Sequence, residues 1–419
     1  MQKQNIVAGI DIGSTSIKTV IAEQIYGEET MRIIGVSTAP SFGMRRGVII
    51  DAMEVSKAIE QSLTAAERMS GAQLKKVVTN IGGAEIAFQQ TKGVIAVGRA
   101  DGEVTEDDIE RVLREAQAVP LPMNDEIVHV IPKKYRLDDH DNIKDPLGMR
   151  GVRLEVSALV IQSSSTQIKN ITKCAQQLGI EIEDIVLEPI AAGTAVLSKK
   201  QKELGVVLIN LGGGTTSLAV YEEGDLLHTA IIPVGSGHIT NDIAIGLRTS
   251  VDIAEKIKLE YGSAQTEGVS KKEGIDLAQL DSQEDGIVSR HHLAEIIEAR
   301  MEEIFELVLK ELKLIGKAGL LPAGAVLVGG GAKMPHIVEL AKDKLKLPVQ
   351  LGFPSGFGGI LDKIDDPSFA TVSGMVIWGK HQQSYSGKQN KNSGDGNVLF
   401  KKAGTVFDKI KGLSSKFLP

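Results

Sequence analysis

Two short segments of the chain have the residue types of a phosphate-binding loop. Residues 11–18 read DIGSTSIK and residues 210–217 read NLGGGTTS, and each segment lies between two apolar runs typical of β-strands. Each therefore predicts a tight hairpin, in which glycine permits positive φ and lets backbone N–H groups approach an anion. One such hairpin is most often only a turn. A matched pair indicates two related lobes that hold a phosphate group between them.

A third glycine-rich segment, residues 326–335, reads VLVGGGAKMP and leads from a strand into a helix expected over residues 336–345. Taken alone, it is equally typical of an ordinary strand-to-helix turn with proline near the helix start. Together, the three segments resemble the nucleotide site of the actin, Hsp70 and sugar-kinase superfamily. In that superfamily two hairpins bind the phosphates from opposite lobes and the third loop contacts adenosine. The resemblance implies ATP and Mg²⁺ as ligands.

Several single residues occupy positions that have a role in that superfamily. The resemblance implies that Asp11 holds the waters around Mg²⁺, that Lys18 meets the β-phosphate and that Glu188 orients an attacking water. It places Glu255 and Lys258 on a helix that lines the adenine and ribose. Glu188 could equally offset a helix dipole, and Glu255 with Lys258 could form a solvated charge pair. The other ATP-binding residues implied are Gly13, Ser14, Thr15, Asn210, Gly212, Gly213, Gly214, Thr215, Thr216, Gly235, Gly329, Gly330 and Gly331.

The second hairpin departs from the superfamily pattern at both ends. Asn210 and Ser217 stand where aspartate is usual. The Asn210 amide keeps a carbonyl that accepts a hydrogen bond, but it lacks the charge that would help to hold Mg²⁺ or polarise a water. We therefore expect ATP binding with weak or absent ATPase activity, and the sequence leaves open whether the protein is an enzyme.

An insertion within the first lobe has a composition of its own. It contains a charged helix over residues 105–118, opened by Thr105 in a Thr-x-x-Asp capping pattern. Strand-like runs follow over residues 126–132 and 153–162. A subdomain of this content at this point resembles the FtsA family of bacterial cell-division proteins, and residues 235–244, GSGHITNDIA, are similar to a pattern of the same family. The alternative is a decorative surface insertion.

The resemblance implies an α/β, actin-like two-lobed fold with duplicated ribonuclease-H-like lobes. Helices that cross between the lobes are expected to begin at residue 188 and to cover residues 370–378. The expected divisions are a first lobe core over 1–84 and 163–195, an FtsA-type inserted subdomain over 85–162, a second lobe core over 196–238 and 306–380, a second-lobe insertion over 239–305, a flexible linker over 381–402 and an amphipathic helix over 403–419.

Composition agrees with a large globular protein of more than one core. The chain has 419 residues, of which 42% are apolar and only 4% aromatic, so it offers no stacking platform for nucleic acid. Its single Cys174 excludes an internal disulfide. The N-terminus has no basic region followed by an apolar run, and no stretch approaches 18 uninterrupted apolar residues. These features predict a cytoplasmic protein without a spanning helix.

The C-terminal segment predicts membrane contact. After a polar stretch, residues 403–419 form an amphipathic pattern whose apolar residues share one arc of a helix, with lysines at its edges. The residues expected to contact an anionic phospholipid membrane are Val406, Phe407, Lys409, Ile410, Lys411, Leu413, Lys416, Phe417 and Leu418. The alternative is a helix that docks on the protein body, which the polar stretch disfavours.

The FtsA resemblance implies a peripheral protein on the cytoplasmic side of the cell membrane at the division septum. Such a protein polymerises with itself and anchors the FtsZ ring, which it contacts through the second-lobe insertion. It recruits later division proteins through the inserted subdomain. Two other classes remain: another actin-superfamily scaffold, of the pilus-assembly or shape-determining type, and a sugar or acid kinase, for which no base in a recognisable context is present.

Overall fold

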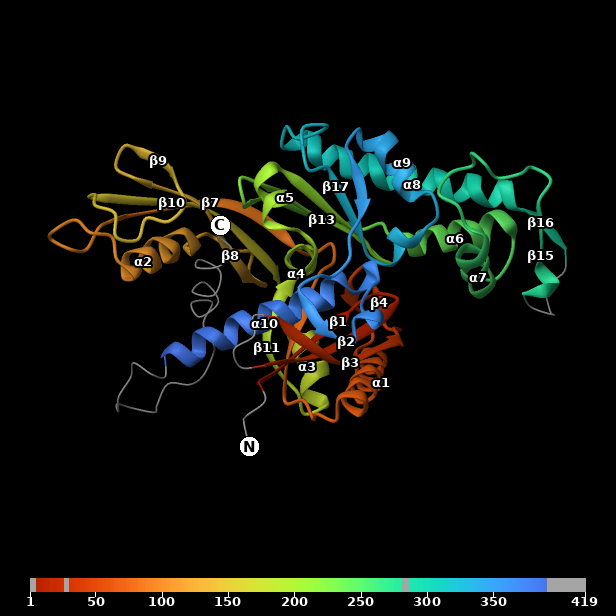
Figure 1. The fold of residues 1–419 in the computed structure, drawn as a ribbon, viewed down its shortest axis with the longest axis horizontal. Helices are drawn as coiled ribbons and strands as arrows, with labels where there is room; N and C mark the ends of the chain where they lie inside the picture. The colour runs from red at the N-terminus through yellow and green to blue at the C-terminus, as the bar shows by residue number, and fades with distance from the viewer. Residues whose placement is uncertain (1–4, 26–29, 281–285, 390–419) are drawn as a thin grey trace.

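A computed structural model of the protein describes residues 5–25, 30–280 and 286–389. Two lobes, each built on its own sheet, lie side by side, and an inserted subdomain projects from them (Figure 1). The N-terminal part of the chain forms most of the first lobe, and residues 199–351 form the second lobe. Two helices, α4 (Glu188–Val196) and α10 (Ala370–Gln389), lie where the lobes meet.

The first lobe has a six-stranded sheet in the order β11-β6-β1-β2-β3-β19. Its central strands form an antiparallel β1–β2–β3 meander, and β6 is parallel to β1. The strands are β1 (Asn5–Ile12), β2 (Ser16–Gln24), β3 (Met31–Pro40), β6 (Lys76–Ile81), β11 (Glu181–Leu187) and β19 (Phe357–Gly359), with a small hairpin of β4 (Met44–Arg45) and β5 (Val48–Ile49). The helices are α1 (Ala52–Ser70) and α3 (Ser165–Gln177). Asp51 caps α1, and Gly71 ends it in the left-handed conformation.

The second lobe repeats this plan around a five-stranded sheet in the order β14-β13-β12-β17-β18. Strand β12 is antiparallel to β13 and parallel to β17, as β1 is to β2 and β6, so the predicted duplication of the lobes is confirmed. The strands are β12 (Val206–Leu211), β13 (Thr216–Glu222), β14 (Asp225–Ile232), β17 (Ala325–Val328) and β18 (Val349–Leu351). The helices are α5 (Lys199–Leu204), α6 (Ser236–Leu247), α7 (Val251–Tyr261), α8 (Arg290–Leu314) and α9 (Ile337–Leu345).

The inserted subdomain, which comprises α2 and the strands β7 to β10, has a core of its own. Its four strands are ordered β7-β10-β8-β9, and α2 covers one face of them. The predicted capping box is present, because Thr105 and Asp108 exchange side-chain and backbone hydrogen bonds. The elements are β7 (Ala87–Ala96), α2 (Glu106–Gln117), β8 (Asp125–Leu137), β9 (His140–Ile143) and β10 (Arg153–Ser164). A packed core distinguishes this subdomain from a decorative loop.

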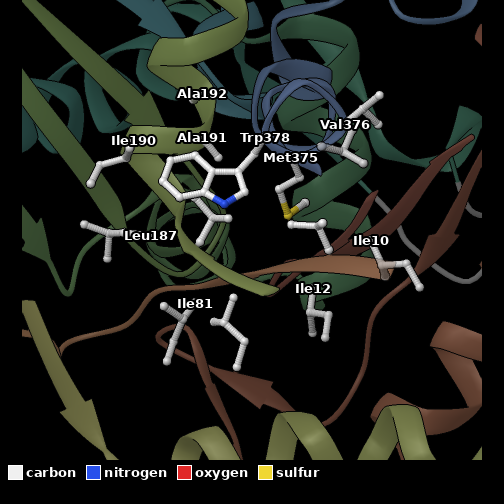
Figure 2. Close-up of a cluster of buried hydrophobic side chains, with 14 of the residues drawn as sticks. Ile10, Ile12, Ile81, Leu187, Ile190, Ala191, Ala192, Met375, Val376 and Trp378 are labelled. Carbon is white, nitrogen blue, oxygen red and sulfur yellow. The ribbon is translucent and has the colours of Figure 1, made fainter. Parts of the chain in front are cut away.

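The two predicted crossing helices are α4 (Glu188–Val196) and α10 (Ala370–Gln389), and their backbones touch. A Cβ built on Gly374 of α10 would lie 1.7 Å from the carbonyl oxygen of Ala191 on α4. Around this contact Met375, Val376 and Trp378 face the apolar residues of α4 and of the first-lobe strands (Figure 2). The same core cluster includes second-lobe residues, so both lobes are packed on the helix pair.

The structure differs from the expected divisions at two boundaries. Helix α10 continues to Gln389, so residues 381–389 are helical where a flexible linker was predicted. Helix α8 crosses the predicted division at residues 305/306 without a break, and one core spans both sides of it. Within the expected second-lobe insertion, β15 (Gly274–Asp276) pairs with β16 (Ile287–Ser289).

The contact at Gly374 gives the first prediction. Gly374→Ala should force α4 and α10 apart and lower the free energy of unfolding by about 1 to 3 kcal/mol, the usual cost of overpacking a tight core. Urea unfolding followed by circular dichroism measures this. Gly358→Ala is the matched control, because a Cβ at Gly358 meets open space. Equal stability of the two variants would contradict the close crossing.

Candidate functional site

A cavity of about 690 Å³ lies between the lobes, and side chains and backbone from both lobes line it. The glycine-rich segments recognised in the sequence converge on it although they are far apart in the chain. Of the predicted site residues, those that line the cavity are Asp11, Gly13, Ser14, Thr15, Lys18, Glu188, Asn210, Gly212, Gly213, Gly214, Thr215, Glu255, Lys258, Gly329, Gly330 and Gly331.

The two hairpins have the same local geometry. The Gly13 N–H donates to the Ser16 carbonyl at 3.2 Å, and the Gly212 N–H donates to the Thr215 carbonyl at 3.0 Å. The loop tips face each other, since a Cβ on Gly213 would lie 2.3 Å from Cγ2 of Thr15. A side chain at position 213 would collide with the Thr15 side chain, and the arrangement leaves N–H groups of both lobes around a small common space.

Two carboxyl groups lie at the floor of the cavity, and burial acts on both. Desolvation raises the pKa of Asp11, although the nearby Lys18 opposes this. Desolvation, reinforced by the charge of Asp11, raises the pKa of Glu188 to about 8. Asp11 also accepts a hydrogen bond of 2.9 Å from Nδ2 of Asn80. A buried pair of carboxyl groups with raised pKa values fits a site that a divalent cation would neutralise.

Asn210, at the end of β12, links three elements of the site. Its Nδ2 donates to Oε1 of Glu188 at the start of α4 and, at 3.4 Å, to Oγ1 of Thr371 at the start of α10. Its Oδ1 also excludes any side chain at position 329, because a Cβ on Gly329 would lie 2.2 Å from it. Gly329 has a φ of 88°, which also favours glycine. The Asn210 amide therefore donates a hydrogen bond to the Glu188 carboxylate, which an ionised aspartate at this position could not do.

The third loop enters a short 3₁₀ helix, η2 (Gly330–Lys333), before α9, and thus begins its helical part earlier than predicted. Across the cavity, the Lys258 ammonium donates to Oε2 of Glu255 at 2.6 Å and to Oγ1 of Thr240 at 2.8 Å. Lys258 is only 7% exposed, whereas the Glu255 side chain is 44% exposed, so solvent reaches this charge pair from the Glu255 side only. These groups face the same space as the glycine backbone of the third loop.

Two predicted site residues do not line the cavity. Thr216 is fully buried in β13, where it pairs with Ile232, and Gly235 is buried behind the second hairpin. A Cβ on Gly235 would lie 2.5 Å from the Gly212 carbonyl, so this glycine supports the loop by allowing close packing. Ser236 and Gly237, the next two residues, line the cavity instead.

Sequence reasoning also missed lining residues. Asn80 ends a first-lobe strand, and Phe369 and Thr371 lie where η4 (Pro367–Phe369) joins α10. The Lys18 ammonium stands 5.8 Å above the centre of the Phe369 ring. A polar residue at a strand end was the available signal for Asn80. Phe369 had none, because only the tertiary fold brings it near the first hairpin.

Comparison with known proteins identifies the family. The sequence profile described as "Cell division protein FtsA" matches residues 207–374, and the profile "SHS2 domain inserted in FTSA" matches residues 83–162. The chain is 36% identical to the cell division protein FtsA of Pseudomonas aeruginosa over 92% of this chain and 91% of that protein. It is 40% identical to FtsA of Bacillus subtilis, over 90% and 84% respectively. The chain belongs to the FtsA family of cell division proteins.

Solved structures of other proteins share the FtsA-family fold seen here. A chain of the PilM–PilN type IV pilus biogenesis complex matches with a TM-score of 0.66 at 15% identity, over 89% of this chain and 98% of that one. MreB 5 of Spiroplasma citri bound to AMPPNP matches with a TM-score of 0.53 at 14% identity, over 92% and 98%. These likenesses confirm the predicted actin-like fold, and the insert profile confirms its FtsA-type subdomain.

The predicted membrane contacts of this FtsA-family chain lie outside the described residues. They belong to residues 403–419, and the described part of α10 ends at Gln389. Among the helices that the structure describes, none has both the length and the apolar character required to cross a bilayer.

The raised pKa of Glu188 gives the second prediction. Below pH 4.5, the pKa of Glu188 in the unfolded chain, the carboxyl is neutral in both states and does not change the free energy of unfolding. Above that pH its ionisation favours the unfolded state, and the free energy of unfolding falls until the pH exceeds the folded pKa of about 8. Glu188→Gln keeps an acceptor for Asn210 but cannot ionise. Between pH 5 and 8 the free energy of unfolding should therefore fall less in the variant than in the parent. One pKa unit corresponds to about 1.4 kcal/mol, so the difference should reach a few kcal/mol.

Urea unfolding at a series of pH values measures this difference. Glu181→Gln, which changes an exposed glutamate on β11, serves as the matched control for the loss of a carboxylate. Parallel profiles of the parent and Glu188→Gln would show that Glu188 titrates as an ordinary solvated carboxyl.

Proposed function

We propose that this FtsA-family protein is an ATP-binding, actin-like polymer subunit that anchors the FtsZ ring to the membrane. The observation that carries the proposal is the cavity between the lobes, where two matched hairpins and a third glycine loop present their backbone to one space. A relative in fold, MreB 5 of Spiroplasma citri, was solved with AMPPNP and in a second structure with ADP. The cavity of about 690 Å³ is of the size expected for a cofactor site.

The roles proposed for the lining residues follow from their chemistry. The N–H groups of both hairpins, with Ser14, Thr15 and Lys18, would bind the phosphate oxygens. The buried Asp11 carboxylate would hold the waters of a Mg²⁺ ion, whose charge would offset the burial of Asp11 and Glu188. Glu255, oriented by Lys258, would accept from the ribose, and the third loop would lie against the base.

Hydrolysis is proposed to be weak or absent. Glu188 is the candidate for orienting a water, but its Oε1 already accepts from Asn210, and Asn210 itself carries no charge. A single-turnover assay with radiolabelled ATP tests this proposal. A rate within the usual range of enzymes, about 1 to 10³ s⁻¹, would contradict it.

Gly330 gives a sharp test of nucleotide binding. It lines the cavity, and a Cβ at this position meets open space, so a larger side chain should fill the site without disturbing the fold. Gly330→Leu should abolish the binding of fluorescent ATP, measured by titration, and leave the thermal midpoint unchanged. Gly358→Leu, at a second open position away from the cavity, should bind as the parent does. Normal binding by Gly330→Leu would place the nucleotide elsewhere.

The partners are proposed from the family. FtsZ would contact the second-lobe insertion, later division proteins would contact the inserted subdomain, and further copies of the chain would form a filament. Co-sedimentation of purified FtsZ with the protein, with and without ATP, tests the first contact. A kinase would show no such association, and a scaffold of the pilus-assembly or shape-determining type would not recognise FtsZ.

Membrane attachment on the cytoplasmic face is proposed to depend on the C-terminal segment. Five lysines and one aspartate follow residue 398, whereas the whole chain has a net charge of −7. The remainder is therefore strongly acidic and would be repelled by anionic lipid, so the tail supplies the attraction. One short amphipathic helix binds lipid weakly, and polymerisation would present many tails together and raise the avidity.

Two phenylalanines of the tail test this attachment. Replacing both Phe407 and Phe417 by glutamate puts two charges into the apolar arc and should release the protein from vesicles that contain anionic phospholipid. Flotation of vesicles measures binding, and fluorescent ATP titration should give an unchanged affinity. As a control, Ser415→Glu adds one charge outside the arc. Unchanged flotation of the double variant would overturn the membrane assignment.

A further inference from the structure

The inserted subdomain is attached to the first lobe through a buried apolar contact. Side chains of its strands β8 and β10 belong to the core of the first lobe, namely Val128, Ile131, Leu159 and Ile161. Within this contact, the Leu187 N–H donates to Nε2 of His129 at 3.0 Å, and the His129 ring lies 5.5 Å from that of Trp378 on α10. Burial of this kind fixes the subdomain to the first lobe, and the two move together.

A second attachment joins the inserted subdomain to the second lobe, and its chemistry differs. The Lys133 ammonium donates to the Leu227 carbonyl at 2.7 Å. Lys134 pairs with the Glu223 carboxylate at 2.8 Å, and Lys144 donates to the Glu223 carbonyl at 2.7 Å. We call these three lysines and the segment 222–227 that they reach the lysine contact. All three donors lie on the insert, and all three acceptors lie at the β13–β14 turn.

The lysine contact is the weaker of the two attachments. It borders a cavity of about 480 Å³ between the subdomain and the turn, and in the segment 222–227 the apolar core of the first attachment includes Leu226. Lys134 and Glu223 are exposed to solvent, where salt screens an ion pair. Lys133 is more buried: desolvation lowers its pKa, and the charge of Asp225 opposes this. A separation of the lobes would break this contact before it broke the apolar one.

The lysine contact is made while the lobes are closed. In the same structure, the tips of the two phosphate hairpins are close enough that a Cβ on Gly214 would lie 2.5 Å from Oγ of Ser14. Opening the cavity requires the hairpins to separate. Because the subdomain follows the first lobe, a separation of the two lobes as whole bodies carries its lysines away from the β13–β14 turn, which belongs to the second lobe (Figure 1).

We propose that the inserted subdomain is an electrostatic latch, in which Lys133, Lys134 and Lys144 hold the two lobes closed. The latch acts on the lobes whether or not a nucleotide is present. If the cavity binds ATP, as proposed above, the latch also slows nucleotide release. Linkage then requires that a partner which displaces the subdomain from the turn weakens nucleotide binding, and that bound nucleotide opposes such a partner.

The first experiment detects the latch without nucleotide. In Lys134→Cys/Glu223→Cys, a short bismaleimide should join the two thiols, and the yield should fall at high salt when the remaining lysines release the turn. Lys134→Cys/Asp343→Cys is the control, because Asp343 lies on α9, away from the subdomain (Figure 1). The native Cys174 is buried and should not react. Equal yields from both pairs, or a yield that salt does not change, would overturn the latch.

The second experiment measures closure and its consequence. The variant Lys133→Met/Lys134→Gln/Lys144→Gln should have a larger radius of gyration by small-angle X-ray scattering without nucleotide, and Lys92→Gln, on the neighbouring strand β7, should not. With fluorescent ATP bound, release should be several-fold faster from the triple variant and slower from the crosslinked pair, and high salt should remove the difference between parent and variant. Identical scattering of parent and triple variant would overturn the proposal. Failure of every protein to retain ATP would contradict only the nucleotide site.

Discussion

The backbone contact between α4 and α10 is the constraint on which the rest of the structure depends. At Gly374 the two helices approach until no side chain fits between them, and residues of both lobes pack around this crossing. The N-terminal ends of both helices lie at the cavity, because α4 begins with Glu188 and α10 begins one residue before Thr371. Asn210 joins the two ends by hydrogen bonds, so the crossing fixes the geometry of the site.

The electrostatics of the site give a physical reason for asparagine at position 210. Asp11 and Glu188 are already buried together, and each has a raised pKa. An aspartate at position 210 would bring a third negative charge into the same desolvated space and would repel Glu188 at hydrogen-bond distance. The amide donates to Glu188 instead and stabilises the closed site. Asparagine in place of aspartate thus favours stable binding in such a site. It removes a charged group that rapid hydrolysis would use.

The sequence predicted the parts of the fold that local chemistry determines. Glycine at the loop tips predicted both hairpins, because the backbone there must approach a neighbour, and Thr105 with Asp108 predicted the start of α2. The positions of Asn80 and Phe369 in the cavity depend on which strands and helices pack together, and no local pattern carries that information. Gly235 lies outside the cavity lining for the same reason, because it packs behind the second hairpin.

The length of α10 could not be predicted from the local sequence either. It decides which parts of the molecule contact the same helix. Within one helix, Thr371 lines the cavity, Gly374 touches α4 and Trp378 meets His129 of the inserted subdomain. Seven residues of helix, roughly 10 Å, separate the first of these contacts from the last. A packed helix of that length moves as a rigid body. A displacement at the cavity end is therefore transmitted to the apolar attachment of the subdomain, because the cavity and the subdomain contact the same helix.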